Sequence, residues 1–171
     1  MEARPKIDVP PTPADKAAEL LAWGALALLW GFTVWSFFHL PNTIPIHFDA
    51  AGVPDHYGKK DSILMLPLVA TGLFAAMTAI VTAFSKFPHA LNYPVTITPA
   101  NALGQYRAAI RMARGLRIGM VLMFLLLVFQ TAQTATGRAD SLGAWTLPVT
   151  LGLLVGLPGL CYWITVASAH K

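Results

Sequence analysis

The chain has 171 residues, of which 56% are hydrophobic and 12% are charged, with a formal net charge of +4. An ordinary soluble domain has about 25% charged residues, so this composition excludes a typical soluble globular protein. A basic excess on a membrane protein is explained by contact with anionic lipid and does not require a nucleic-acid partner.

Four apolar stretches are each long enough to cross the roughly 30 Å of hydrocarbon as an α-helix. We place them at about residues 20–38, 63–84, 118–136 and 145–168. No charged residue lies inside these ranges, and their apolar residues surround each helix nearly completely, which is typical of lipid-exposed spans. The sequence therefore predicts an all-α membrane protein with a single four-span domain over residues 13–171.

Residues 1–12 contain several prolines and no apolar periodicity, so we expect a mobile tail. Thr12 and Pro13 form a cap-plus-proline helix start, and the helix should end before Pro41. Lys and Arg are concentrated in the tail and in residues 85–117. By the positive-inside rule this places both termini on the cytoplasmic side and residues 40–61 outside.

Residues 40–61 form a polar loop with proline and glycine between two spans. Apolar and polar residues alternate over Ile44–Asp49, and Gly52 lies in a turn sequence, which together favour a compact, hairpin-like loop. Cys161 is the only cysteine, so no intrachain disulfide holds this loop. The residues expected to meet a ligand or partner are His47, Phe48, Asp49, Gly52, Pro54, Asp55, His56, Tyr57 and Lys60.

Three interpretations of this loop remain open. His47, Asp49, Asp55 and His56 are candidate ligands for a transition metal, although their spacing is not a specific metal motif. The alternative is structural, with the aspartates capping turns. A docking surface for an extracytoplasmic peptide or toxin ranks above the metal interpretation, because loops on rigid scaffolds often carry function.

The connection before the third span contains two further candidate groups. Thr98 and Pro99 predict a second helix start, after which Arg107, Arg111 and Arg114 share one cytoplasmic face. This face is expected to meet lipid phosphate through snorkelling side chains, with a protein partner as the alternative. A polar floor under the bundle is predicted from His89, Asn92, Tyr93, Asn101, Gln105 and Tyr106, which are otherwise ordinary interfacial polar residues.

Glycines at four-residue spacing, Gly115 with Gly119 and Gly152 with Gly156, allow helices to approach closely. We expect this packing to be intramolecular. No charged relay lies at mid-span and no hydrolase, metalloprotease or nucleotide-binding motif occurs, so an enzyme is disfavoured and no cofactor is expected.

Two motifs resemble a known family. The first runs from Leu40 to Lys60 as Leu-Pro-x-x-Ile-Pro-Ile-His-Phe-Asp-x-x-Gly-x-Pro-Asp-x-x-Gly-x-Lys, and the second is Phe-Pro-His-x-x-Asn-Tyr-Pro-x-x-Ile-Thr over residues 87–98. They resemble the uncharacterised membrane domain at the N-terminus of SdpI-type toxin-immunity proteins. The resemblance covers about residues 20–117, and SdpI-type proteins continue into further spans that this chain does not show.

That resemblance implies an inner-membrane protein that binds or senses an extracytoplasmic ligand or toxin through residues 40–61, related to immunity and signalling proteins. Two alternatives belong to other classes. One is an accessory subunit of a larger membrane complex or a homo-oligomer, packed through glycine-rich faces. The other is a metal-dependent membrane enzyme or small transporter that uses His47, Asp49, Asp55 and His56.

Overall fold

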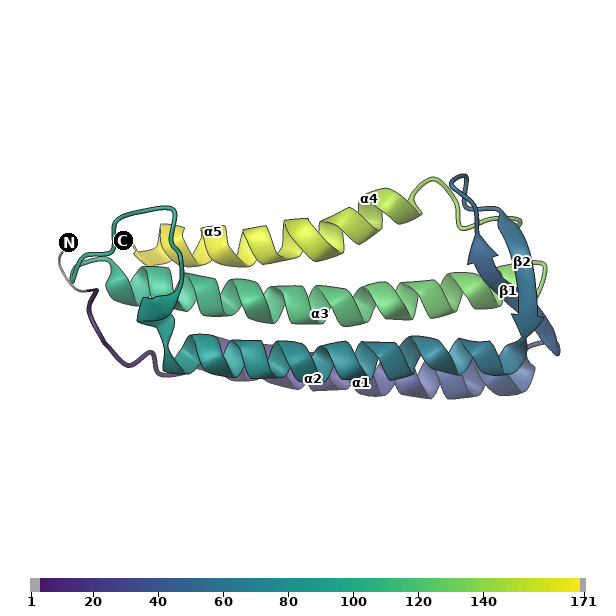
Figure 1. Ribbon diagram of the computed structural model, residues 1–171, viewed down its shortest axis with the longest axis horizontal. Coiled ribbons are helices and arrows are strands. Elements are labelled where there is room, and N and C mark those ends of the chain that lie inside the picture. Colours follow the sequence, from purple (N-terminus) through teal and green to yellow (C-terminus); the bar gives the residue numbers. More distant parts are fainter. Residues whose placement is uncertain (1–3, 170–171) are drawn as a thin grey trace.

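A computed structural model describes residues 4–169 and shows four long antiparallel helical segments with a small β-hairpin at one end (Figure 1). They are α1 (Pro13–His39), α2 (Met65–Lys86), α3 (Ala102–Ala135), and a final segment of α4 (Thr146–Leu151) and α5 (Leu157–Ala169). Each segment is long and apolar enough to cross a membrane. The predicted fold class is confirmed.

The two ends of the bundle carry different structures. Strands β1 (Thr43–Phe48) and β2 (Pro54–Lys59) lie at one end, here called the hairpin end, together with the connection between α3 and α4 (Figure 1). Residues 4–12, the connection 87–101 and the end of α5 lie at the other, here called the tail end. Ligands that approach from the two sides of a membrane would therefore meet unrelated surfaces.

Helix α1 begins and ends as its sequence predicts. Thr12 is the N-cap and forms a capping box with Asp15, and Pro13 occupies the first turn. Leu40 leaves the helical region directly before Pro41, because a residue preceding proline is disfavoured there. A hydrogen bond from Trp30 Nε1 to Thr71 Oγ1, 3.0 Å long, joins the middle of α1 to α2.

Helix α3 occupies the centre and packs against α1, α2 and α5. It begins at Ala102, so the predicted helix start at Thr98 and Pro99 is wrong by about one turn. The reason is local: Asn101 donates to the carbonyl of Thr96 and accepts from the amide of Thr98, which holds residues 96–101 as a turn. The span predicted at residues 118–136 forms the second half of α3, which ends at Ala135.

The last transmembrane segment is interrupted by a π-helical turn, Gly152–Gly156, between α4 and α5. Pro158 lies two residues after the end of this turn. Proline has no backbone N–H and its ring collides with the carbonyl four residues earlier, so a widened turn relieves the strain. Pro158 is thus accompanied by a change of helix type.

Glycine allows α3 to approach this last segment. A Cβ built on Gly119 would lie 2.0 Å from the carbonyl oxygen of Leu153, and one on Gly115 would lie 3.0 Å from Cys161 Sγ. Within the described part of the chain, Cβ atoms on Gly152 and Gly156 would meet no heavy atom within 4 Å. Only the first glycine pair therefore makes the expected intramolecular contact.

We predict that Gly119→Ala destabilises the protein by about 1–3 kcal/mol, because a backbone carbonyl has to move to admit the new methyl group. The measurement is reversible unfolding in mixed detergent. Gly152→Ala is the matched control, since it adds a methyl group to open space and should leave the unfolding free energy unchanged or slightly raised. Equal stability of the two variants would contradict the close contact at Gly119.

Candidate functional site

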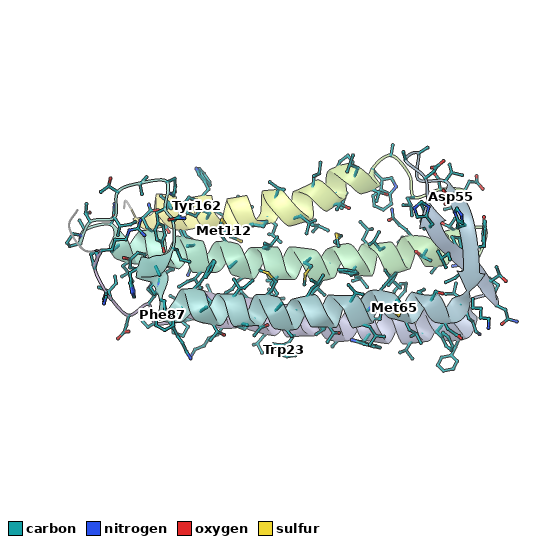
Figure 2. The ribbon with its side chains drawn as sticks, viewed as in Figure 1. Trp23, Asp55, Met65, Phe87, Met112 and Tyr162 are labelled. Carbon is teal, nitrogen blue, oxygen red and sulfur yellow. The ribbon has the colours of Figure 1, made fainter. Side chains whose placement is uncertain are left out.

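The β-hairpin stands beyond the helix ends, and Asp55 marks its position in Figure 2. Its strands are antiparallel, and the turn between them is stabilised by Asp49. Asp49 Oδ1 accepts hydrogen bonds from the amides of Ala51 and Val53, both 2.9 Å long, and Gly52 adopts the left-handed region with φ +78°. This loop was predicted as compact and hairpin-like, and residues 43–59 form a two-stranded hairpin.

The hairpin is fixed to the bundle at its base and at its tip. At the base, Ile44 and Ile63 are buried with Leu40 in the main apolar core, and Lys60 N donates to Asn42 O. At the tip, Leu142 N donates 2.9 Å to Gly52 O. Buried contacts and tertiary hydrogen bonds at two separate points restrict how this loop can move relative to the helices.

The tip contact is itself supported from α3. Gln130 Nε2 donates 2.8 Å to the carbonyl oxygen of Leu142, the same residue whose amide binds Gly52. A Cβ on Gly52 would lie 3.2 Å from Leu142 Cβ. The hairpin tip, the 136–145 connection and α3 therefore form one connected unit.

Two β-bulges change which side chains share a face. The register pairs Pro45 with Tyr57, His47 with His56 and Phe48 with Pro54, so Ile46 and Asp55 are each left unpaired. Neighbouring residues on a regular strand point to opposite faces. Because Asp55 is the extra residue of a bulge, its carboxylate turns to the same side as the neighbouring His56.

As a result His47, Asp55 and His56 converge. His47 Nδ1 lies 2.6 Å and His56 Nδ1 lies 3.2 Å from the same oxygen, Asp55 Oδ1. The hydrogen bond from His47, with a smaller contribution from His56, holds the pKa of Asp55 below its usual value. Among the described residues, these three form the only group of three or more His, Cys, Asp or Glu close enough to share a metal ion.

The other predicted hairpin residues have different positions. Asp49 belongs to the turn and does not join the cluster of His47, Asp55 and His56. Tyr57 is exposed, whereas Phe48 and Pro54 are half-buried. Lys60 Nζ lies 4.8 Å from the centre of the Phe37 ring, a cation–π contact at the base of the hairpin.

The polar floor residues lie at the tail end and contact the chain before α1. Tyr106 donates from its hydroxyl to Pro5 O, 2.9 Å, and Arg4 donates to His89 O, 3.2 Å. Residues 4–12 thus have defined contacts, in contrast to the mobile tail expected for residues 1–12. Residues 1–3 lie outside the described part.

Further hydrogen bonds link this floor to itself and to α5. Tyr93 donates to Pro88 O, 2.8 Å, and Tyr162 donates to Gln105 Oε1, 2.9 Å. Burial raises the pKa of Tyr93 to about 12, so its hydroxyl stays protonated and able to donate. Asn101 holds the turn before α3. All the contacts described for these polar floor residues are hydrogen bonds within the protein.

The three arginines of the predicted basic face differ in their surroundings. Arg111 donates 2.9 Å to Asp15 Oδ1, and Arg114 donates 2.9 Å to Glu19 Oε1 and 3.1 Å to Asp15 Oδ1. Their guanidinium groups therefore turn towards α1, which differs from the expected snorkelling to lipid. Lipid contact stays a prediction for Arg107, whose Nε is buried without a hydrogen-bond partner among the described residues.

Arg111, Arg114 and Arg117 form an ion cluster with Asp15 and Glu19, and its centre was not predicted from the sequence. Arg117 is fully buried, contacts Glu19 and Thr78, and lies 5.0 Å from the centre of the Phe74 ring. Glu19 and Arg117 directly precede the predicted spans, so both were counted outside the membrane. Their signal was the i, i+4 spacing of Asp15 and Glu19, which puts two carboxylates on one face of α1.

We predict that Glu19→Gln lowers the free energy of unfolding by about 3–5 kcal/mol, because it leaves buried Arg117 without its carboxylate. Detergent unfolding measures the change, with exposed Lys16→Gln as the control on the same helix turn. Replacing Glu19 and Arg117 together by Leu and Met should recover most of the loss. A Glu19→Gln variant as stable as the Lys16→Gln variant would contradict the role of the cluster.

For the hairpin, we predict that Gly52→Ala loosens the tip, since alanine is disfavoured at φ +78° and its methyl group would crowd Leu142. Hydrogen exchange of the Leu142 amide should become faster, while the amides in the middle of α2 stay protected. Ala50→Ser, an exposed change in the same turn, is the control. Unchanged exchange at Leu142 would show that the tip contact does not hold the hairpin.

These features define a four-span membrane protein with a rigidly attached hairpin at one end. Residues 24–71, which include the whole hairpin, match a family described as a domain of unknown function (DUF1648). The chain is also 35% identical over 89 residues to an uncharacterized protein of Archaeoglobus fulgidus. That match covers 50% of this chain and 49% of the relative, so the chain spans about half the length of the curated relative it matches. No solved structure matches the chain.

Proposed function

We propose that this protein is a non-enzymatic membrane receptor that binds an extracytoplasmic peptide or toxin with its hairpin. The observation that carries the proposal is the attachment of the hairpin at two points, by the buried base around Ile44 and by the Gly52–Leu142 contact. A loop that only linked two spans would need neither of these attachments. A preorganised loop loses less conformational entropy when it binds.

The hairpin also has the surface that a peptide ligand requires. Ile46, Val53 and Tyr57 are large, apolar or aromatic, and exposed, next to the polar cluster of His47, Asp55 and His56. Between β1 and the bundle lies a groove of about 420 Å³, lined mainly by apolar residues that include Ile46, Met65 and Leu127. Exposed aromatic anchors beside an apolar groove are typical of peptide-binding surfaces.

The orientation and the class of protein complete the proposal. The Lys and Arg distribution supports a cytoplasmic tail end and a hairpin on the outer side. The family resemblance supports a bacterial plasma membrane as its location. The resemblance of residues 40–60 and 87–98 to SdpI-type proteins supports a role in toxin immunity or signalling. The basic tail end would then face anionic lipid or a cytoplasmic partner through Arg107.

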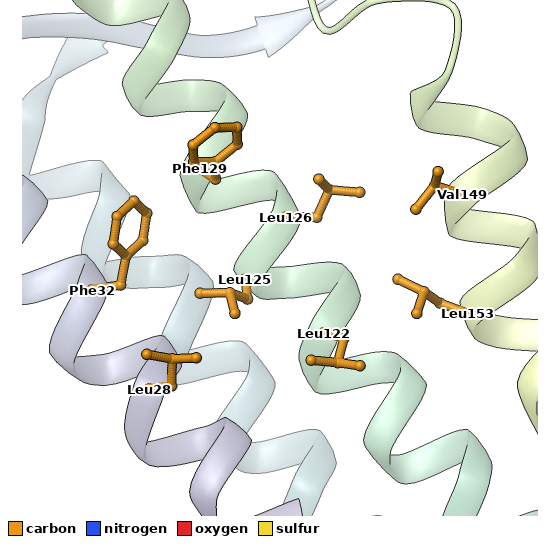
Figure 3. A pocket seen from close by; sticks show the side chains of 8 residues that line it. All are labelled: Leu28, Phe32, Leu122, Leu125, Leu126, Phe129, Val149 and Leu153. Atoms are coloured by element: carbon orange, nitrogen blue, oxygen red, sulfur yellow. The ribbon is translucent and has the colours of Figure 1, made fainter.

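A second candidate function, an accessory subunit or homo-oligomer, is favoured by the last transmembrane segment. The segment packs mainly on α3 and leaves an apolar groove of about 440 Å³ between α1, α3 and α4 (Figure 3). Eight apolar side chains line it: Leu28, Phe32, Leu122, Leu125, Leu126, Phe129, Val149 and Leu153. Lipid chains or a helix of another membrane protein would fit this surface.

We predict that untagged protein in nanodiscs, incubated with the secreted peptides of its native host and analysed by native mass spectrometry, retains a discrete peptide. The double variant Ile46→Ala/Tyr57→Ala should lose it, because both exposed side chains lie on the hairpin. The control Leu73→Ala/Ile80→Ala removes exposed apolar residues from α2 and should retain it.

Equal retention by both double variants, or no retention by the wild type, would contradict the receptor proposal. Protein extracted directly from native membranes then gives the second test. An unrelated membrane protein that remains bound in the mass spectrum would support the accessory subunit, whereas a multiple of this chain would support a homo-oligomer.

A further inference from the structure

The cluster of His47, Asp55 and His56 has the composition and shape of a metal site. Two imidazoles from opposite strands direct Nδ1 at one oxygen of Asp55, and the three ligand atoms lie within 4.8 Å of one another. The imidazole rings are 5.7 Å apart and nearly perpendicular, at 88°. Two imidazoles and one carboxylate form a set that suits zinc and copper and is less suited to magnesium or calcium.

The distances from the two imidazoles to Asp55 can be compared with what a small ion needs. Zinc binds nitrogen and carboxylate oxygen at about 2.0–2.2 Å, so the donors of a tetrahedral site lie about 3.3 Å apart. The two observed Nδ1 to Oδ1 distances are 2.6 and 3.2 Å. His47 Nδ1 would have to move about 0.7 Å away from Asp55 Oδ1 to reach this spacing. Each neutral ring would then bind through Nδ1 with its proton on Nε2.

Strand pairing and a β-bulge bring the three ligands together. The cross-strand pairing of His47 with His56 supplies one ligand from each strand, and the bulge at Asp55 brings the carboxylate to their side. Asp49, the fourth candidate from the sequence, is held in the turn by two amide hydrogen bonds. The protein therefore provides three ligands and leaves a fourth position open, as in catalytic or ligand-binding zinc sites.

An ion can reach the site directly from solvent. The side chains of His47 and His56 are 65% and 73% exposed, and that of Asp55 is 38% exposed. A His–Asp pair with a purely structural role needs only one imidazole. Here a second imidazole, that of His56, also reaches Asp55 Oδ1. The attachment of the hairpin at its base and tip limits how far the ligands can separate.

We propose that His47, Asp55 and His56 bind a divalent transition-metal ion, with zinc as the reference ion, across the two strands of the hairpin. The open position faces solvent and takes water or a donor atom of a bound molecule. This inference does not depend on the receptor function, since an ion bound to both strands would equally stabilise a hairpin without a ligand.

The test uses the full chain in nanodiscs, without a histidine tag, stripped with a chelator and titrated with Zn²⁺ by calorimetry and native mass spectrometry. We expect about one ion per chain. His47→Ala and His56→Ala should each weaken binding by at least about tenfold. The control is His39→Ala, because His39 Nδ1 already binds the carbonyl of Trp35 outside the cluster.

Hydrogen exchange gives a second readout that nonspecific surface binding would not move. Zn²⁺ should slow exchange of the amides of β1 and β2 in the wild type and in His39→Ala, and should have no effect in His56→Ala. Asp55→Asn, which preserves the size of the side chain, should weaken binding as the histidine changes do. Each variant is first checked for an unchanged helix signal by circular dichroism.

A wild type that takes up no ion, or His47→Ala and His56→Ala variants that bind as tightly as His39→Ala, would overturn the metal site. Peptide retention measured with a chelator present separates this result from the receptor proposal. Loss of zinc binding with peptide retention intact would remove only the metal site. Zinc binding without any retained peptide would remove only the receptor.

Discussion

The ion cluster between α1 and α3 determines how the rest of this bundle is arranged. Arg117 is fully buried, and its partners Glu19 and Thr78 come from α1 and α2. A buried guanidinium without a carboxylate is strongly unfavourable, so these contacts restrict the register of three helices at once. Apolar packing alone would not do so, because lipid is as apolar as the faces of the helices. The cluster therefore fixes the frame from which the hairpin extends.

The opposite end is held by a different kind of contact. Gln130 on α3 binds the carbonyl of Leu142, and the amide of Leu142 binds Gly52 at the hairpin tip. The same helix thus carries the arginines at the tail end and supports the hairpin at the other end. A rigid central helix explains how a loop of about twenty residues can keep a defined surface outside the membrane.

The sequence predicted the spans and the hairpin-like loop because hydropathy and turn residues are local signals. It also named His47, Asp55 and His56 as candidate ligands, together with Asp49. It could not predict that these three converge without Asp49, since regular alternation places Asp55 and His56 on opposite faces and the bulge that reverses this arises from strand pairing. Asn101 likewise overrode the helix start at Thr98 through a turn of its own. Glu19 and Arg117 were visible in the sequence, but their pairing depends on which helices are neighbours.

The single cysteine, Cys161, lies in α5 and faces Gly115, far along the chain from the hairpin. The hairpin therefore has no covalent crosslink, and an isolated two-stranded hairpin is at best marginally stable in water. Its base and tip contacts supply part of the missing stability. A metal ion bound by His47 on β1 and by Asp55 and His56 on β2 would supply a crosslink between the strands, at the point where two bulges weaken their pairing. The bulges that interrupt the ladder are thus the same features that assemble the ligands.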